Sequence, residues 1–324
     1  MNKYIKINRI EFSITNTCTS RCKHCSIGDT LNTDKSSIDK EKALSVISEL
    51  VKLYSIESVM TFGGEPLLYA DTVCAIHKIA TDIGIPKRQI ITNGYFSKDI
   101  CKITTVAKSL KESGVNSILL SVDSFHKEHI PLEHIYPFAK VLCNEKIDGF
   151  KLHPAWVVNR EHDNRFNKET EECINYFSDL HIAISKGNNI FPAGNAVVYL
   201  SEFYEKKSID LSIKCGEAPY TEKLDNIETI AINPNGDVII CCFVIGNVYE
   251  ESITEIIERY NPYENQLMST LLIGGVTALV DLAETNGIIV DVSQYYSACS
   301  VCREIVKKAK PHKMSVKKYM MDFE

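Results

Sequence analysis

Three cysteines near the start of the chain have the spacing of a metal site. Cys18, Cys22 and Cys25 form a C-x3-C-x2-C run directly after an apolar segment. A cubane 4Fe–4S cluster has four irons, so three thiolates leave one iron open, as in catalytic rather than structural metal sites. A fourth cysteine would indicate an electron carrier, and a nearby CxxC with histidines would indicate zinc, but neither accompanies the run. The spacing predicts a catalytic cluster; the alternative is three free cysteines in a loop.

A second motif follows at the end of a segment that has the composition of a buried strand. Residues 58–62 have the sequence Ser-Val-Met-Thr-Phe, and Gly63, Gly64, Glu65 and Pro66 come directly after them. Two glycines allow backbone to approach a ligand closely, and the Glu65 carboxylate can accept a hydrogen bond from an ammonium group. Taken alone, this segment would be an ordinary turn.

Together the two motifs resemble the radical S-adenosylmethionine (SAM) superfamily, whose signature is CxxxCxΦC. His24 occupies the ring position Φ. The resemblance implies that the open iron chelates SAM, and that one electron then cleaves it to methionine and a 5′-deoxyadenosyl radical. It also implies that the GGEP motif binds the SAM amino group, that His24 lies in the SAM site, and that a one-electron reductant such as flavodoxin or ferredoxin is a partner.

Composition and charge limit the partners and the cellular compartment that we expect for this protein. The chain has 324 residues and a net charge of −6 without a basic block, so a nucleic-acid partner is not expected. The longest apolar stretch, Leu271–Val280, is too short to span a bilayer, and the N-terminus lacks a signal peptide, so no membrane partner is expected. Twelve cysteines without an export signal indicate metal ligation in a reducing compartment. We therefore expect a cytoplasmic protein.

Alternating strands and helices are predicted to carry the motifs. Helical periodicity is clearest over 37–54, where Ser36 and Asp39 resemble a capping box, and over 71–83, which Gly84 would end. This alternation predicts an α/β fold with a parallel sheet, and it matches the partial (β/α)6 barrel of the resembled superfamily. We assign residues 1–206 to this barrel and 207–324 to an auxiliary iron–sulfur domain. The expected strands are 10–14, 58–62, 89–92, 117–122, 149–157 and 181–185.

Sites in such barrels lie at the carboxyl ends of the strands, where further polar residues occur. Asn93 ends the third expected strand, while Ser121 and Asp123 end the fourth. By the resemblance these three are candidates for the SAM site, as is Gly194 in a small-residue segment after the sixth strand. A turn or a helix cap is the alternative for each. His126 either faces the substrate or is an exposed loop histidine.

A second group of cysteines lies in the last third of the chain. Asn235 and Gly236 predict a hairpin turn between strands at 230–233 and 238–243. The arrangement resembles a shortened SPASM, or twitch, domain, which holds one auxiliary 4Fe–4S cluster; zinc held by four thiolates is the alternative. The group consists of Cys215, Cys241, Cys242, Cys299 and Cys302, of which the last two form a CxxC pair.

Four thiolates fill an auxiliary cluster, so one of the five cysteines is spare. Successive strand side chains point to opposite faces, and we expect one of Cys241 and Cys242 to ligate iron while the other faces elsewhere, for example toward the barrel mouth. A spare S–H group can return a hydrogen atom to a carbon radical. An epimerase needs this chemistry, because hydrogen is removed from one face of a carbon and returned to the other.

The motif order over nearly the whole chain resembles the radical SAM peptide epimerases of ribosomal peptide natural products, although only the cysteine pair is specific to them. This resemblance implies that Cys215, Cys241, Cys299 and Cys302 hold the auxiliary cluster and that Cys242 donates hydrogen. It also implies a precursor peptide as substrate. Only 17 residues precede Cys18, so we expect the peptide at the barrel mouth or on the 249–294 insertion. The alternative for this insertion is packing over the auxiliary cluster.

Other interpretations remain open. The substrate could be a sugar or aminocyclitol, acted on by an epimerase or a dehydrogenase, or a peptide that receives a thioether or carbon–carbon crosslink. A non-catalytic iron–sulfur or zinc scaffold is disfavoured, because a carrier needs no amine-binding strand end. We expect the four remaining cysteines, Cys74, Cys101, Cys143 and Cys173, to lie on helices in the core.

Overall fold

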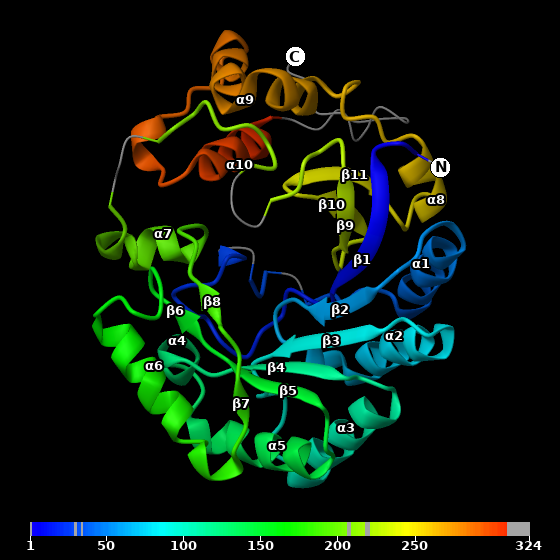
Figure 1. Cartoon of the computed structure of the whole chain (residues 1–324), viewed down its shortest axis with the longest axis vertical. Coiled ribbons are helices and arrows are strands. Elements are labelled where there is room, and N and C mark those ends of the chain that lie inside the picture. Colours follow the sequence, from blue (N-terminus) through cyan, green and yellow to red (C-terminus); the bar gives the residue numbers. More distant parts are fainter. Residues whose placement is uncertain (1, 29–30, 34, 206–208, 218–220, 310–324) are drawn as a thin grey trace.

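One nine-stranded sheet runs through the molecule in the order β11-β10-β9-β1-β2-β3-β4-β5-β7 (Figure 1). The computed structural model describes residues 2–28, 31–33, 35–205, 209–217 and 221–309. Within the sheet, consecutive parallel strands form the partial barrel predicted from the sequence. They are β1 (Ile5–Ser13), β2 (Ser58–Phe62), β3 (Lys87–Thr92), β4 (Ser117–Ser121), β5 (Gly149–His153) and β7 (Ala183–Ile184).

Helices cover the outer side of these strands (Figure 1). Asp39 caps the first of them by accepting a hydrogen bond from the Lys42 amide at 2.8 Å, so the capping box that we expected from Ser36 is wrong. Gly84 ends the second helix with a φ of 86°, as predicted. The helices between residues 40 and 199, not all of which lie on that side, are α1 (Lys40–Leu53), α2 (Ala70–Ile83), α3 (Ile100–Glu112), α4 (Ser124–Lys127), α5 (Leu132–Asn144), α6 (Arg165–Asn175) and α7 (Asn195–Tyr199).

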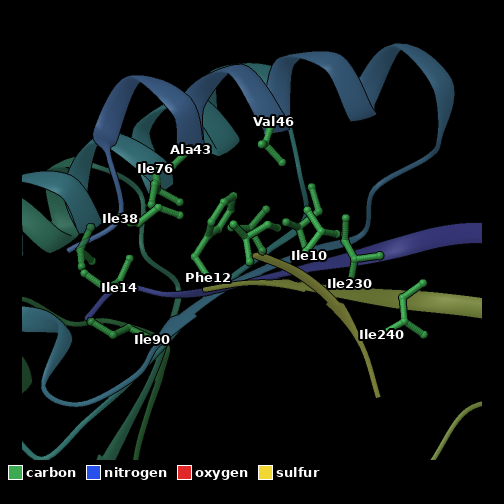
Figure 2. Packing of buried hydrophobic residues seen from close by; sticks show 14 of the residues in the cluster. Ile10, Phe12, Ile14, Ile38, Ala43, Val46, Ile76, Ile90, Ile230 and Ile240 are labelled. Carbon is green, nitrogen blue, oxygen red and sulfur yellow. The ribbon is translucent and has the colours of Figure 1, made fainter. Parts of the chain in front are cut away.

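The core between α1 and the sheet fixes the strand that leads into the cysteine run. Figure 2 shows Ile10 and Phe12 of β1 beneath Ala43 and Val46 of α1, with Ile230 from the C-terminal part of the chain beside them. All five side chains are buried. Each large aliphatic or aromatic side chain buried in this way contributes about 1.5–3 kcal/mol. The end of β1, where the cysteine loop begins, is therefore held firmly.

The expected strand over 149–157 is two strands. Pro154 has no N–H group for the sheet ladder, and the chain leaves the main sheet there. The following strand β6 (Ala155–Trp156) pairs instead with β8 (Asn188–Asn189) in a separate two-stranded sheet.

We placed a domain boundary at residue 206, but three strands that come later in the sequence belong to the same main sheet. The strand β9 (Ile227–Ile232) pairs in parallel with β1, and β10 (Asp237–Ile240) and β11 (Phe243–Asn247) follow as antiparallel neighbours. The predicted hairpin between β9 and β10 is confirmed, with Gly236 at a φ of 85°. The two expected domains thus share one sheet.

Helices α8 (Ile253–Glu258), α9 (Gln266–Thr285) and α10 (Ala298–Lys308) complete the described chain. Gly275 breaks α9 with φ 71° and ψ −166°. Among the described residues, α9 alone has the length and composition of a membrane span. The helix is longer than the apolar stretch Leu271–Val280 from which we judged its length in the sequence. It packs against α10, with Leu271 and Leu279 buried, as a core helix does. Short 3₁₀ helices lie at η2 (Pro66–Tyr69), η3 (Ser178–Leu180), η4 (Ser201–Phe203) and η5 (Val292–Gln294).

Candidate active site

The loop after β1 gathers the first cysteines. The Ser20 amide donates a hydrogen bond to Cys18 Sγ at 3.4 Å, and Ser20 Oγ lies 2.9 Å from Cys22 Sγ. The Cys25 amide donates to the Cys22 carbonyl at 3.1 Å. Burial raises the pKa of Cys18 to about 12, and the nearby Glu65 carboxylate acts in the same direction. A cation is therefore needed to hold the Cys18 thiol as a thiolate, which is what iron supplies.

The two glycines of the second motif pack against this loop. A Cβ atom on Gly64 would lie 2.1 Å from the Thr17 carbonyl oxygen, and one on Gly63 would lie 2.7 Å from that of Thr15. The Gly64 amide donates to the Thr15 carbonyl at 2.6 Å. The close approach that we expected toward a ligand is thus made to the cysteine loop, just before Cys18.

Glu65 is fully buried and largely engaged within the protein. Its Oε1 accepts from Thr92 Oγ1 at 2.7 Å and from the Leu67 amide at 2.9 Å, and its Oε2 accepts from the Asn93 amide at 2.8 Å. Burial raises the pKa of Glu65 to about 6, although these hydrogen bonds oppose the rise. A carboxylate offers about four acceptor positions, so one remains for an ammonium group. Pro66 begins η2, which Glu65 caps.

Asn93 lies between the second motif and the cysteine loop. Its Nδ2 donates to Thr19 Oγ1 at 3.1 Å and approaches Cys18 Sγ at 3.6 Å. Its Oδ1 accepts from the Tyr95 amide at 2.8 Å. The end of β3 therefore meets the cysteine loop, as expected of a strand-end residue in this fold.

Asp123 and His126 form a buried pair beside the same loop. Both carboxylate oxygens lie 2.9 Å from His126 Nδ1, and the nearby Cys22 also raises the pKa of the imidazole. Only 16% of the His126 side chain is exposed, so the exposed-loop alternative is wrong. Burial favours neutral groups, but the pairing outweighs it: the pKa of Asp123 falls to about 2, and that of His126 lies well above its usual value. Ser121, at the end of β4, is also buried.

His24 contacts this pair from the cysteine loop. Its ring centroid lies 5.2 Å from that of His126, and its Nδ1 is buried without a partner among the described residues. Burial lowers the pKa of His24 to about 4, so the ring is neutral at physiological pH. A neutral imidazole with a free polar atom suits a bound ligand.

Gly194 supports the far side of the loop. It has a φ of 56°, and a Cβ there would lie 2.6 Å from the Cys25 carbonyl oxygen and 2.8 Å from that of Ser26. Asn195 adds hydrogen bonds from its amide to the Cys25 carbonyl at 3.0 Å and from Nδ2 to the Cys22 carbonyl at 3.1 Å. A small residue is required at 194 because the cysteine loop packs directly on it.

The C-terminal cysteines line one pocket between the β10–β11 hairpin and helices α9 and α10. Our expectation for Cys241 and Cys242 is wrong in one respect: β10 ends at Ile240, and the pair forms the turn before β11. Cys241 has a φ of 55°, which the turn requires. Alternation along a strand therefore does not separate the two side chains. Lining residues include Cys215, Cys241, Cys242, Cys299 and Cys302, with Leu271, Val276 and Arg303.

The two turn cysteines have different thiol neighbours. Burial raises the pKa of Cys215 and of Cys299, and the neighbouring Cys241 raises both further. The pKa of Cys242 is instead shifted by its thiol neighbours Cys241 and Cys302. The hydrogen bond with Cys242 and burial hold the pKa of Cys241 well above its usual value. The thiols whose pKa is raised, those of Cys215, Cys241, Cys242 and Cys299, remain protonated at neutral pH unless a metal displaces the proton.

The remaining cysteines lie on helices, but not all lie in the core. All twelve cysteines are free thiols. Cys173 is buried, Cys74 and Cys143 are half-buried, and Cys101 is exposed, so the core assignment is wrong for Cys101.

Two family models match this arrangement. Residues 12–148 match the radical SAM superfamily, and residues 226–303 match SPASM, an iron–sulfur cluster-binding domain. The chain contains a radical SAM domain followed by a SPASM domain. The two domains imply a SAM-binding 4Fe–4S cluster, an auxiliary iron–sulfur cluster and SAM as cofactors.

Curated relatives match only part of this chain. GTP 3′,8-cyclase of Limosilactobacillus fermentum is 32% identical over 122 residues, which cover 37% of this chain and 34% of that protein. GTP 3′,8-cyclase of Aquifex aeolicus is 32% identical over 197 residues, covering 57% of this chain and 56% of that protein. The chain thus spans about a third to just over half of their length.

Solved structures resemble the fold of this chain along almost its whole length. Streptococcus suis SuiB bound to precursor peptide SuiA has a TM-score of 0.54 at 15% identity, with 92% of this chain and 76% of that chain covered. The enzyme anSMEcpe with bound AdoMet has a TM-score of 0.51 at 12% identity, with 93% and 95% covered. At these identities the likeness shows the fold.

The residues present fit the implied cofactors. Cys18, Cys22 and Cys25 would hold the SAM-binding cluster, and the unpartnered His24 Nδ1 beside them suits a polar ligand such as SAM. The five cysteines of the second pocket exceed the four thiolates that an auxiliary 4Fe–4S cluster needs. Sequence analysis missed Ser20, because a polar loop residue becomes recognisable only by its contacts with the cysteines.

Proposed function

We propose that this radical SAM enzyme is a peptide epimerase, which converts an L-residue to a D-residue in a ribosomally made peptide. The observation that carries the proposal is the fifth cysteine of the SPASM-domain pocket, because a 4Fe–4S cluster takes only four thiolates. One thiol therefore remains available beside the cluster, and an epimerase needs such a hydrogen donor.

The neighbours of the two turn cysteines support Cys242 as the donor. Cys241 lies near both Cys215 and Cys299, whereas Cys242 has Cys241 and Cys302 as its thiol neighbours. We therefore take Cys215, Cys241 and Cys299, which line one pocket, as three of the four ligands. Cys302 is the fourth, because it lines the same pocket and is paired with Cys299 in the CxxC.

The chemistry assigns a separate task to each group. When bound, SAM and its cluster supply the radical that removes the Cα hydrogen of the substrate. The Cys242 thiol then gives its hydrogen atom to the opposite face of that carbon, so the S–H bond breaks and a C–H bond forms. The resulting sulfur radical takes up one electron and one proton to become a thiol again. The electron comes from a one-electron reductant such as flavodoxin or ferredoxin.

A peptide substrate is supported by proteins of similar fold. SuiB was solved with a precursor peptide, and anSMEcpe was solved with the Cp18Cys peptide. The GTP 3′,8-cyclases match a shorter part of the chain, so a nucleotide substrate is kept as an outcome of the test. We also infer a cytoplasmic location, since all twelve cysteines are free thiols.

The test uses the full-length enzyme reconstituted anaerobically in deuterium oxide with SAM and a reductant. Candidate peptides come from short reading frames beside its gene, and GTP is tested in parallel. Wild type should yield an epimerised peptide with one deuterium, whereas Cys242→Ala should form 5′-deoxyadenosine without an inverted product. The exposed Cys101→Ala variant is the matched control and should behave as wild type.

Three results would contradict the proposal. A peptide product lighter by two hydrogens, with Cys242→Ala still active, would indicate dehydrogenation or crosslinking. Turnover of GTP without turnover of any peptide would indicate a nucleotide substrate. An inverted, deuterated product from Cys242→Ala would show that another group donates the hydrogen.

A further inference from the structure

Ser20 contacts two of the three cysteines in the first cysteine loop. It lies in the three-residue spacer between Cys18 and Cys22 and is only 3% exposed. Its amide donates to Cys18 Sγ at 3.4 Å, and its Oγ lies 2.9 Å from Cys22 Sγ. The second contact is shorter than the 3.6 Å between Asn93 Nδ2 and Cys18 Sγ. Ser20 thus links Cys18 and Cys22 within the loop.

Iron binding fixes the direction of the Ser20 hydrogen bond. In a pair of free hydroxyl and thiol groups, either atom can donate. A thiolate bound to iron has no proton, so the hydroxyl of Ser20 must donate to Cys22 Sγ. Cys22 is also buried, so little water competes for the sulfur.

Such a hydrogen bond changes the stability of the reduced cluster relative to the oxidised cluster. Reduction adds negative charge to the cluster and its thiolates, and a hydrogen-bond donor stabilises that charge. Hydrogen bonds to the sulfurs and the groups around the ligands are among the factors that set cluster potentials. The contact therefore favours the reduced state, which must form before SAM is cleaved.

We propose that Ser20 is a positioning residue that raises the reduction potential of the SAM-binding cluster by donating a hydrogen bond from its hydroxyl to Cys22. The inference rests on the radical SAM assignment and not on the epimerase proposal. The identity of the substrate therefore does not enter its test.

The test is a potentiometric titration of the reconstituted full-length enzyme without SAM, followed by electron paramagnetic resonance. The signal of the SAM-binding cluster is recognised by its change when SAM is added. Ser20→Ala should shift the reduction equilibrium toward the oxidised cluster about tenfold, equal to about 59 mV for a one-electron couple. Ser20→Thr retains a hydroxyl and should stay close to wild type.

Two further variants make the result decisive. Ser26→Ala removes an exposed hydroxyl from the same loop and should leave the potential unchanged. If Ser20→Ala holds no cluster, Ser20→Val is compared with the equally large Ser20→Thr, and only the valine variant should have the lower potential. An unchanged potential in the alanine variant, or equal potentials in the valine and threonine variants, overturns the proposal.

Discussion

At the scale of single residues, the roles of Cys241 and Cys242 can be separated by iron content. If Cys241 is a ligand, Cys241→Ala should lose the auxiliary cluster and with it roughly half of the iron, since each 4Fe–4S cluster holds four irons. Cys242→Ala should keep nearly all of its iron. Iron and sulfide analysis after anaerobic reconstitution measures both. Loss of half the iron from Cys242→Ala alone would reverse the two roles.

Sequence analysis found the residues of both cysteine groups but not all of their surroundings. The spacing of Cys18, Cys22 and Cys25 is local and could be read from the sequence, whereas the contacts of Ser20 with Cys18 and Cys22 could not. The backbone at Cys241 was not predictable, because a non-glycine residue at a φ of 55° has no strong sequence signal. Strand alternation was therefore applied one residue beyond the end of β10.

At the scale of elements, the break in α9 holds the loop that carries Cys215. Because α9 is interrupted at Gly275, the amides of Val276 and Thr277 are free to donate to the carbonyls of Ile213, at 3.4 Å, and Leu211, at 2.9 Å. Only glycine readily adopts the backbone angles at residue 275, and a Cβ there would lie 3.1 Å from the Ser212 carbonyl oxygen.

We therefore expect Gly275→Ala to destabilise this loop by about 1–3 kcal/mol and to lower the iron content of the auxiliary cluster. The SAM-binding cluster should remain. Gly287→Ala is the matched control, because Gly287 also has a positive φ, of 76°, but a Cβ there meets nothing within 4 Å. Equal iron content in the two variants would contradict a role for the α9 break in holding Cys215.

Helix α2 contains a histidine that links stability to pH. His77 is fully buried, and its Nε2 lies 2.9 Å from Thr61 Oγ1 of β2. Burial, and then the charge of Arg88, lowers the pKa of His77 to about 3. The unfolded chain binds a proton near the ordinary pKa of about 6.5, whereas the folded protein does not, so stability is lost as pH falls below that value.

The free energy of unfolding that is lost through His77 should reach about 1.4 kcal/mol at about pH 5.5. Urea unfolding of wild type and His77→Gln at about pH 7.5 and about pH 5.5 measures it, because other titrating groups cancel in the difference between the two proteins. Wild type should lose this amount relative to the variant on acidification. Parallel pH profiles would show that His77 is not buried in its neutral form.

At the scale of the whole molecule, local patterns predicted the six parallel strands but not how the chain closes on itself. The strands β1 to β5 and β7 follow one another in the sheet, so sequence order was sufficient there. The pairing of β9 with β1 joins residues more than 200 positions apart, and no local periodicity encodes such a contact. The SPASM domain is consequently built on an edge of the barrel sheet (Figure 1).

This pairing predicts that residues 1–206 do not fold on their own. Their separation from the rest of the chain would leave β1 as an unpaired edge and would uncover the core that Ile230 completes beside Ile10 and Phe12 (Figure 2). We expect this fragment to aggregate, whereas a fragment of residues 1–248, which retains β9, β10 and β11, should stay monomeric. Size-exclusion chromatography and thermal unfolding by circular dichroism compare the two. A monomeric 1–206 fragment with a cooperative transition would instead mean that the barrel strands are stable without β9, and that the shared sheet joins two separately folding units.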